Sequence, residues 1–133
     1  MITGLGIDAV EIDRFTDWAD YPLKKLLRVF SKDEIEYCLS IPIKSAERFA
    51  ARFAAKEAFF KALHMTTPTA HIPLFTICKK VAVKRLDDGT RILSIDWNYL
   101  QKVSKTTLPN AITSHVSLTH TKTTATAIII LEK

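Results

Sequence analysis

The sequence predicts an α+β fold in which an antiparallel sheet packs on one long central helix. Residues Ser45–Leu63 contain no Gly or Pro and are rich in Ala, so they favour a helix. Two runs rich in β-branched residues, Ser114–Thr119 and Thr124–Leu131, favour strands joined by a tight turn. With 133 residues the chain has the usual size of one domain, which we expect to span residues 1–133.

The first strand is predicted from Ile2 to Ile12, where alternate side chains fall on opposite faces. One face combines small and apolar residues with a single acid, Asp8. Two glycines on this face leave space for the close approach of another backbone or a ligand. The residues of this face are Ile2, Gly4, Gly6, Asp8, Val10 and Ile12.

Two shorter helices are predicted between this strand and the central helix. Asp20-Tyr21-Pro22 marks the start of the first, because proline is tolerated in a first turn and aspartate can cap it. Ser31 to Glu34 form a capping-box signature, so a second helix should begin there and run to Leu39. The first helix is amphipathic, with Leu23, Leu26, Leu27 and Phe30 on one side and Lys24, Lys25, Arg28 and Lys32 on the other.

The predicted central helix is apolar nearly all round and should therefore be packed on both sides. An aromatic stripe lies opposite a surface made mainly of alanine. Charges on such a helix are costly unless they are paired or bind a ligand. Glu57 and Lys61 are four residues apart and could simply form an ion pair. The stripe consists of Phe49, Phe53, Phe60 and Leu63, and the charged residues are Arg48, Arg52, Lys56, Glu57 and Lys61.

The remaining chain is predicted as a loop, a hairpin and a short helix before the two final strands. The loop covers residues His64–Pro73, and Leu74–Arg85 alternates enough to be a long strand. Asp87-Asp88-Gly89 should turn this strand back into a partner at Ile92–Ile95. The short helix is expected from Trp97 to Val103.

Composition and charge limit the function classes. The longest apolar stretch, Ala127–Leu131, is too short to span a membrane and no signal pattern opens the chain, so we expect a cytoplasmic protein without a membrane partner. The two cysteines, Cys38 and Cys78, fit no metal or disulfide pattern. The net charge of +5 divides into −2 over residues 1–44 and +7 over residues 45–133. The basic part favours a polyanionic partner, which could be nucleic acid, a phosphorylated cofactor or an acidic protein.

Asp8 and Glu57 are two acidic residues predicted in apolar surroundings, where burying either carboxylate alone is costly. A hard cation bound between them would stabilise both negative charges. Magnesium takes one or two carboxylates, keeps waters, and completes its shell with substrate phosphate oxygens. Basic side chains nearby, such as Arg52, Lys56 and Lys61, would bind the remaining phosphate charge. The residues alone make this pairing a hypothesis.

Four segments resemble the bacterial holo-acyl-carrier-protein synthases, in the order and over the length of that family. Residues 6–15, Gly-Ile-Asp-Ala-Val-Glu-Ile-Asp-Arg-Phe, are similar to its opening pattern. Residues 52–63, with Phe-Ala-Ala-Lys-Glu-Ala and a following Lys, resemble its central signature. Residues 30–34, Phe-Ser-Lys-Asp-Glu, and residues 115–121, His-Val-Ser-Leu-Thr-His-Thr, resemble two further motifs.

The resemblance implies a magnesium-dependent transferase of the 4′-phosphopantetheinyl transferase fold. It would move 4′-phosphopantetheine from coenzyme A to a serine of apo-acyl carrier protein, in fatty acid biosynthesis. Asp8 and Glu57 would hold magnesium, Glu57, Lys61 and His120 would support catalysis, and Arg52, Lys56 and His120 would contact coenzyme A. Arg14 and Arg28 would face the acidic carrier protein, and the family implies a homotrimer with active sites between protomers.

The chain also departs from the family pattern. His64-Met65-Thr66 stands where the family usually has a Gly-Thr-Gly loop, and Gly89-Thr90-Arg91 replaces a Gly-Lys-Pro-like turn. A coenzyme A-binding regulator without catalysis is therefore one alternative, supported only by the missing glycine loop. A small nucleic-acid-binding module is the other. It would explain the positive charge but not Asp8 and Glu57.

Overall fold

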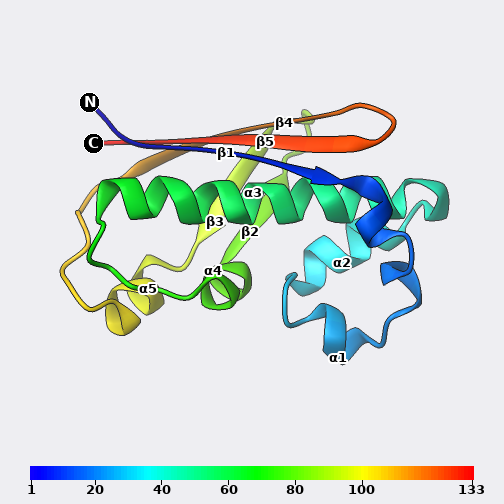
Figure 1. The fold of residues 1–133 in the computed structure, drawn as a ribbon, viewed down its shortest axis with the longest axis horizontal. Coiled ribbons are helices and arrows are strands. Elements are labelled where there is room, and N and C mark those ends of the chain that lie inside the picture. Colours follow the sequence, from blue (N-terminus) through cyan, green and yellow to red (C-terminus); the bar gives the residue numbers. More distant parts are fainter.

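The computed structural model describes residues 1–133 and has a three-stranded antiparallel sheet lying along one long helix (Figure 1). The helix, α3, spans Ser45–Thr66. The strands are β1 (Ile2–Glu11), β4 (Thr113–His120) and β5 (Thr124–Glu132), in the order β1-β5-β4. The predicted antiparallel sheet on a central helix is confirmed.

Strand β1 lies unusually close to α3 because two of its residues lack side chains. A Cβ atom on Gly4 would overlap the carbonyl oxygen of Ala62, and one on Gly6 would overlap that of Ala58. The alanine side of the helix, including Ala54, is fully buried under the sheet. Small residues on both surfaces therefore set the distance between strand and helix.

The opposite side of α3 packs against an aromatic cluster near the N-terminal end of the helix. The Phe49 ring packs against Phe30 in a tilted arrangement with ring centroids 5.0 Å apart, and the Phe53 centroid lies 5.6 Å from that of Phe15. Trp18 contacts several of these rings. Helices α1 (Leu23–Leu26) and α2 (Lys32–Leu39) lie on this side, below α3 in Figure 1. Helix α1 is a single turn, shorter than the amphipathic pattern predicted.

Two predicted helix boundaries depend on capping. Helix α2 begins at the predicted capping box, in which the Glu34 amide donates to Ser31 Oγ at 3.1 Å and the Ser31 amide donates to Glu34 Oε1 at 2.9 Å. Helix α3 continues past Leu63 to Thr66, because residues 64–66 contain no glycine that would end it. The loop predicted for His64–Pro73 therefore begins only after Thr66.

The segment Leu74–Arg85 is not one strand, and this prediction was wrong. Residues Leu74–Lys80 form helix α4, and only Val81–Arg85 form strand β2. Pro73 directly precedes the first helical residue, with a φ of −62° and an extended ψ. The consecutive residues Ile77 and Cys78 are both buried, which fits one face of a helix and not an alternating strand. The hairpin with β3 (Arg91–Ile95) and the helix α5 (Trp97–Val103) are as predicted.

Because β1 lies so close to α3, adding one methyl group at Gly6 should have a large effect on stability. We expect Gly6→Ala to lower the free energy of unfolding by about 1–3 kcal/mol, because its Cβ collides with backbone that cannot turn aside. Urea denaturation followed by circular dichroism measures this change. Ala9→Ser, on the exposed face of the same strand, is the control. A gain in stability, as expected for Gly→Ala in open space, would contradict the packing argument.

Candidate active site

Asp8 points from β1 toward α3, at the position after the two close contacts of Gly4 and Gly6. Its side chain is only 10% exposed. The Oδ1 atom accepts a hydrogen bond from Lys61 Nζ at 2.9 Å, whereas Oδ2 is buried and has no hydrogen-bond donor when Glu57 is ionised. An unpartnered carboxylate oxygen in a buried place is costly, so this atom is available for a ligand.

Glu57 lies beside Asp8, and the pKa of its carboxyl group is raised to about 7. Burial is the largest cause, followed by a hydrogen bond shared with Asp8 and by repulsion from the negative charge of Asp8. The positive charges of Arg14 and Lys61 act in the opposite direction. The two predicted acids are therefore brought together, and their negative charge is incompletely compensated.

This pair of carboxylates fits a hard divalent cation that also binds a substrate. The donors are oxygen atoms, and the buried Asp8 Oδ2 would be satisfied by a cation. The chain has no cluster of three or more His, Cys, Asp or Glu side chains that could hold a metal ion. Two protein ligands are what magnesium uses when phosphate oxygens and water complete its shell.

Lys61 pairs with Asp8 and not with Glu57. Its ammonium group also donates to the carbonyl oxygen of Ile7 at 2.9 Å. The side chain is 53% exposed, so it can reach a ligand that approaches Asp8 from solvent. The simple helical ion pair between Glu57 and Lys61, which the sequence left open, is absent.

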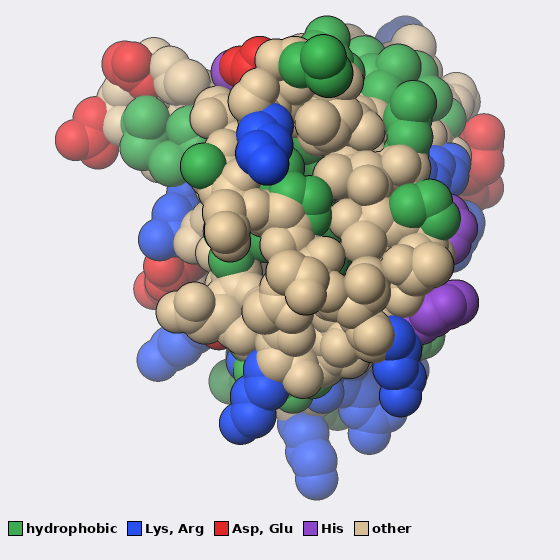
Figure 2. Space-filling view, turned by 90° about the vertical axis from the view of Figure 1, so that its left-hand side faces the viewer, with side chains coloured by type: hydrophobic (Ala, Val, Ile, Leu, Met, Phe, Trp, Pro, Cys, Tyr) green, Lys and Arg blue, Asp and Glu red, His purple; other side chains and the backbone are tan.

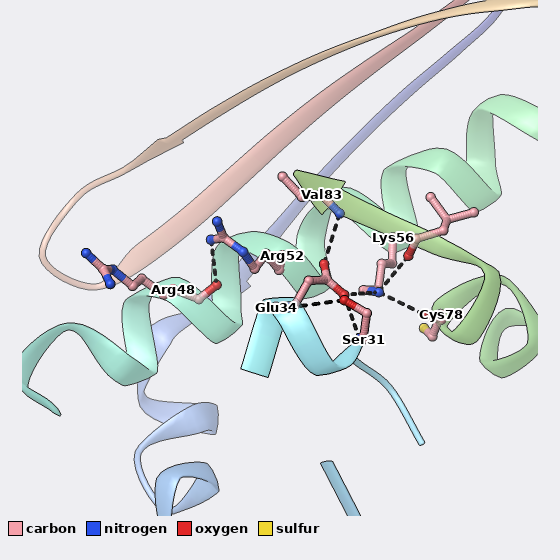
Figure 3. Close-up of polar contacts among 8 residues, drawn as sticks. Ser31, Glu34, Arg48, Arg52, Lys56, Cys78 and Val83 are labelled. Atoms are coloured by element: carbon pink, nitrogen blue, oxygen red, sulfur yellow. Dashed lines mark hydrogen bonds and ion pairs between the residues drawn. The ribbon is translucent and has the colours of Figure 1, made fainter. Parts of the chain in front are cut away.

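Lys56 does not reach a ligand-binding surface, in contrast to the predicted contact with coenzyme A. It is fully buried, and its ammonium group donates to Glu34 Oε1 at 2.8 Å and to the carbonyl oxygens of Cys78 and Val81 at 2.7 and 2.6 Å (Figure 3). These three bonds use all the protons of the ammonium group. The second Glu34 oxygen accepts from the amide of Val83 at 3.0 Å. The ion pair thus joins α2, α3 and β2 in the interior.

Arg52 and His120 line a second feature, a cavity of about 330 Å³ that we call the basic pocket. Arg52 is 3% exposed, and its Nε has no hydrogen-bond partner. His120 Nε2 lies 3.0 Å from Glu47 Oε1. The pocket is lined by Tyr37, Lys44, Glu47, Arg48, Ala51, Arg52, Arg91, Leu118, Thr119 and His120.

The basic pocket and the acidic pair lie at opposite edges of the three-stranded sheet. Asp8 is on β1 and Leu118 of the pocket is on β4, and both pair with Ala127 of the central strand β5. Two strand spacings separate their backbones, which is about 10 Å. Within one chain, His120 and Arg52 therefore belong to a different edge from Asp8.

Several pocket residues were missed by sequence reasoning. Lys44, Glu47 and Arg48 precede Arg52 at helical spacing, so extending the face of Arg52 along the helix would have found them. Arg91 and Tyr37 come from β3 and α2, and no local pattern links them to α3.

The predicted carrier-protein contacts lie in two different places: Arg14 is near Glu57, and Arg28 is in a separate groove. The Arg14 guanidinium lies 5.6 Å from the Phe53 ring centroid and is close enough to Glu57 to lower its pKa. Arg28 lines a groove of about 440 Å³ together with Trp18, Lys25, Val29, Phe75 and Lys79. Figure 2 shows Lys and Arg side chains gathered at the bottom of the molecule, on the side away from the sheet.

The chain matches known proteins over nearly its whole length. Residues 4–127 match the model of the 4′-phosphopantetheinyl transferase superfamily. A holo-[acyl-carrier-protein] synthase of Treponema denticola is 44% identical over 133 residues, covering 99% of both chains. One from Syntrophus aciditrophicus is 38% identical over 133 residues, covering 99% of this chain and 97% of the relative.

Solved structures agree with this match. An ACPS–CoA complex from Chronobacterium ammoniagenes has a TM-score of 0.78 at 25% identity, covering 97% of this chain and 96% of that one. A holo-(acyl-carrier-protein) synthase from Bacillus anthracis in complex with CoA (3′,5′-ADP) has a TM-score of 0.71 at 28% identity, covering 98% and 96%. None of the helices in the present chain is long and apolar enough to cross a membrane.

The raised pKa of Glu57 predicts how stability depends on pH. The folded chain keeps a proton on Glu57 up to about pH 7, whereas the unfolded chain releases it near pH 4.5. The free energy of unfolding should therefore fall as the pH rises between these values. In the presence of a chelator, we expect Glu57→Gln to be more stabilising relative to wild type at about pH 8 than at about pH 5. Urea denaturation at both pH values measures this, and a difference that does not change with pH would contradict it.

Proposed function

Because the chain belongs to the 4′-phosphopantetheinyl transferase superfamily, we propose that Asp8 and Glu57 hold a magnesium ion for phosphoryl transfer. The observation that carries this proposal is the adjacent pair of carboxylates, with the buried Asp8 Oδ2 lacking a partner. When bound, the cation would neutralise charge on the transferring phosphoryl group. Structural neighbours solved with CoA support a phosphorylated ligand for this fold.

The chain transfers 4′-phosphopantetheine from coenzyme A to a serine of apo-acyl carrier protein, and we propose that it does so in fatty acid biosynthesis. The serine oxygen forms a bond to the phosphorus that carries the pantetheine arm. The bond from this phosphorus to the bridging oxygen breaks, and adenosine 3′,5′-bisphosphate leaves. The serine loses its proton, and the product is holo-acyl carrier protein.

Glu57 is proposed as the group that accepts the serine proton. Without a cation its pKa is raised to about 7 by burial and by Asp8. A bound cation would lower this pKa and keep the carboxylate ionised, so that Glu57 would accept the proton directly or through a water molecule. Lys61 would stabilise negative charge on the phosphate oxygens, because its ammonium group lies beside Asp8 and is half exposed. Asp8 keeps Lys61 at this position through the 2.9 Å ion pair.

The basic pocket is proposed to bind phosphate groups of coenzyme A through Arg52 and His120. The low exposure of Arg52 makes an ionic contact there stronger than one in bulk water. Lys56 would act indirectly, because its buried pair with Glu34 fixes α2 and β2 against the helix that carries Arg52. Direct contact of Lys56 with coenzyme A is not part of the proposal.

We propose that active sites form between protomers of a homotrimer. The acidic pair and the basic pocket lie at opposite edges of one sheet, so a neighbouring chain would bring the two edges together. The outer face of the sheet carries exposed apolar side chains, including Leu5, Ile7 and Ile128. Hydrophobic side chains are visible along the top of Figure 2, on the side of the sheet. A patch of this kind is typical of a protein–protein interface.

Arg14 and Arg28 are proposed to bind the carrier protein. Arg14 lies near Glu57, so a partner held there would present its serine close to the proposed base. Arg28 belongs to a groove with two further lysines, and an acidic partner would be attracted by this charge.

Removal of either acid should abolish transfer while leaving the fold intact. We expect Asp8→Ala and Glu57→Gln each to lower kcat/KM by a factor of about 100 or more, because each removes a ligand of the cation. The phosphopantetheine mass increment on apo-acyl carrier protein measures transfer, and magnesium titration with a thermal melt measures binding. Near wild-type transfer by folded Glu57→Gln would refute the site.

A shared site predicts complementation between two inactive variants. Mixing Asp8→Ala with Arg52→Ala under conditions of subunit exchange should restore activity, because about a quarter of the sites in random trimers combine two intact halves. The control is a mixture of Asp8→Ala and Glu57→Gln, which should restore none since both changes affect the same half. A fully active monomer in light scattering, or no recovery despite exchange, would exclude a shared site.

A further inference from the structure

One buried ion pair joins three elements that also surround the basic pocket. The side chains of Glu34 on α2 and Lys56 on α3 are each 1% exposed, and they point toward each other in Figure 3. Neither residue lines the basic pocket. Tyr37, three residues after Glu34 on the same helix, does line it. So does Arg52, four residues before Lys56. The ion pair is therefore one helical turn away from the pocket on both helices.

The hairpin of β2 and β3 has an outer edge that needs hydrogen-bond partners. The amide of Leu86 donates to the carbonyl oxygen of Thr90 at 2.8 Å, at the end of the ladder between the two strands. Hydrogen-bonded pairs alternate with non-hydrogen-bonded pairs along an antiparallel ladder. The odd-numbered residues Val81 and Val83 therefore direct their backbone groups away from β3. Both residues are buried, so these groups need partners within the protein.

The ion pair takes the place of a third strand beside β2. Glu34 Oε2 accepts from the amide of Val83 at 3.0 Å, and Lys56 Nζ donates to the carbonyl oxygen of Val81 at 2.6 Å. A neighbouring strand would offer the same two groups, one acceptor and one donor. Lys56 also donates at 2.7 Å to the carbonyl oxygen of Cys78, in the last turn of α4 where carbonyl groups lack helical partners. Because a two-stranded hairpin is marginally stable alone, its position depends on these bonds.

The hairpin held in this way carries Arg91 into the basic pocket. Arg91 lies on β3 and lines the pocket together with Arg52. Burial lowers the pKa of Arg52, and repulsion from Arg91 acts in the same direction. Neither guanidinium has a carboxylate oxygen within 4.0 Å. The bonds of the ion pair therefore hold the hairpin in place against the repulsion between two like charges.

We propose that Glu34 and Lys56 are positioning residues for the binding of coenzyme A, an inference that rests on the proposed function of the basic pocket. Through β2, the pair sets the distance between Arg91 on the hairpin and Arg52 on α3. It also holds α2, whose Tyr37 ring centroid lies 4.3 Å from the Arg52 guanidinium. A site whose groups are fixed before the ligand arrives binds more tightly, because less freedom is lost on binding.

The acidic pair is held independently of this ion pair. Asp8 is fixed by its bond to Lys61 and by the close packing of β1 on α3. Lys56 precedes Glu57 in the sequence, but its three protons are all used in the interior. Loss of the ion pair should therefore weaken the binding of coenzyme A and leave the chemical step unchanged.

A cycle of single and double variants separates positioning from stability. Glu34→Gln and Lys56→Met each leave one buried charge unpaired and should destabilise the fold strongly. The double variant buries neither charge, so its urea midpoint should lie closer to wild type than either single midpoint. It still lacks the donors that reach Val81 and Cys78. Its KM for coenzyme A should stay about tenfold or more above wild type, while kcat and the KM for apo-acyl carrier protein change less than about twofold.

Leu100→Ala is the control for a loss of stability alone. Leu100 is fully buried on α5, which lies near the other end of α3 from the basic pocket (Figure 1). This variant should be destabilised by the cavity that it creates. Its KM for coenzyme A should stay within about twofold of wild type under conditions where it remains folded. A rise that matches the double variant would mean that stability alone explains the effect, and the inference would be wrong.

Hydrogen exchange gives a readout that does not depend on transfer. In the double variant, peptides from β2 and β3 should exchange about tenfold faster or more, whereas those from β1 and β5 should stay protected. Unchanged exchange of the hairpin would overturn the inference. So would a KM for coenzyme A that recovers together with stability, or a fall in kcat as large as the rise in KM. Failure of wild type to transfer from coenzyme A would instead overturn the proposed function, and the exchange result would still stand.

Discussion

The site depends on the close contact between β1 and the alanine side of α3. Gly4 and Gly6 allow the backbone of the strand to lie on the carbonyl oxygens of the helix. Asp8 follows on the same face, so its carboxyl group is held against the flank of α3 that carries Glu57 and Lys61. A strand with larger side chains would lie farther from the helix, and the two carboxylates would separate. The pKa of Glu57 is therefore a consequence of backbone packing as much as of side-chain chemistry.

The charged residues of α3 occupy separate sides of the helix, and each side has its own chemistry. Lys56 enters the interior, where a buried ion pair is tolerated only because Glu34 and two carbonyl oxygens satisfy it. Glu57 and Lys61 lie beside β1, and Arg48 and Arg52 lie beside β4. A helix buried nearly all round can carry these charges because each one has a partner or faces a cavity.

Sequence patterns predicted most of this fold because most of it depends on local rules. Short stretches of sequence determine three of its elements. These are the strand around Asp8, the helix start at Ser31 and the glycine-free central helix. The structure of Leu74–Lys80 was predicted wrongly, because its apolar spacing is compatible with a strand or a helix. Pro73, directly before it, favours the start of a helix. Asp8 and Glu57 were found as acids in apolar surroundings. The burial of Lys56 and the approach of Arg91 could not be predicted, since both depend on contacts between distant segments.

The proposed sharing of active sites between protomers would also limit which symmetry can complete them. The acids lie at the β1 edge and the arginines at the β4 edge of the same sheet. A two-fold axis places identical surfaces against each other, so it would join β1 to β1 and leave the acids facing acids. A cyclic arrangement of three chains instead joins the β1 edge of one chain to the β4 edge of the next, with every contact identical. In the proposed trimer, acids and arginines would meet at each of the three contacts, and no edge would be left unmatched. The same contact covers the exposed edges of a short sheet, which isolated chains must otherwise protect from pairing with other proteins.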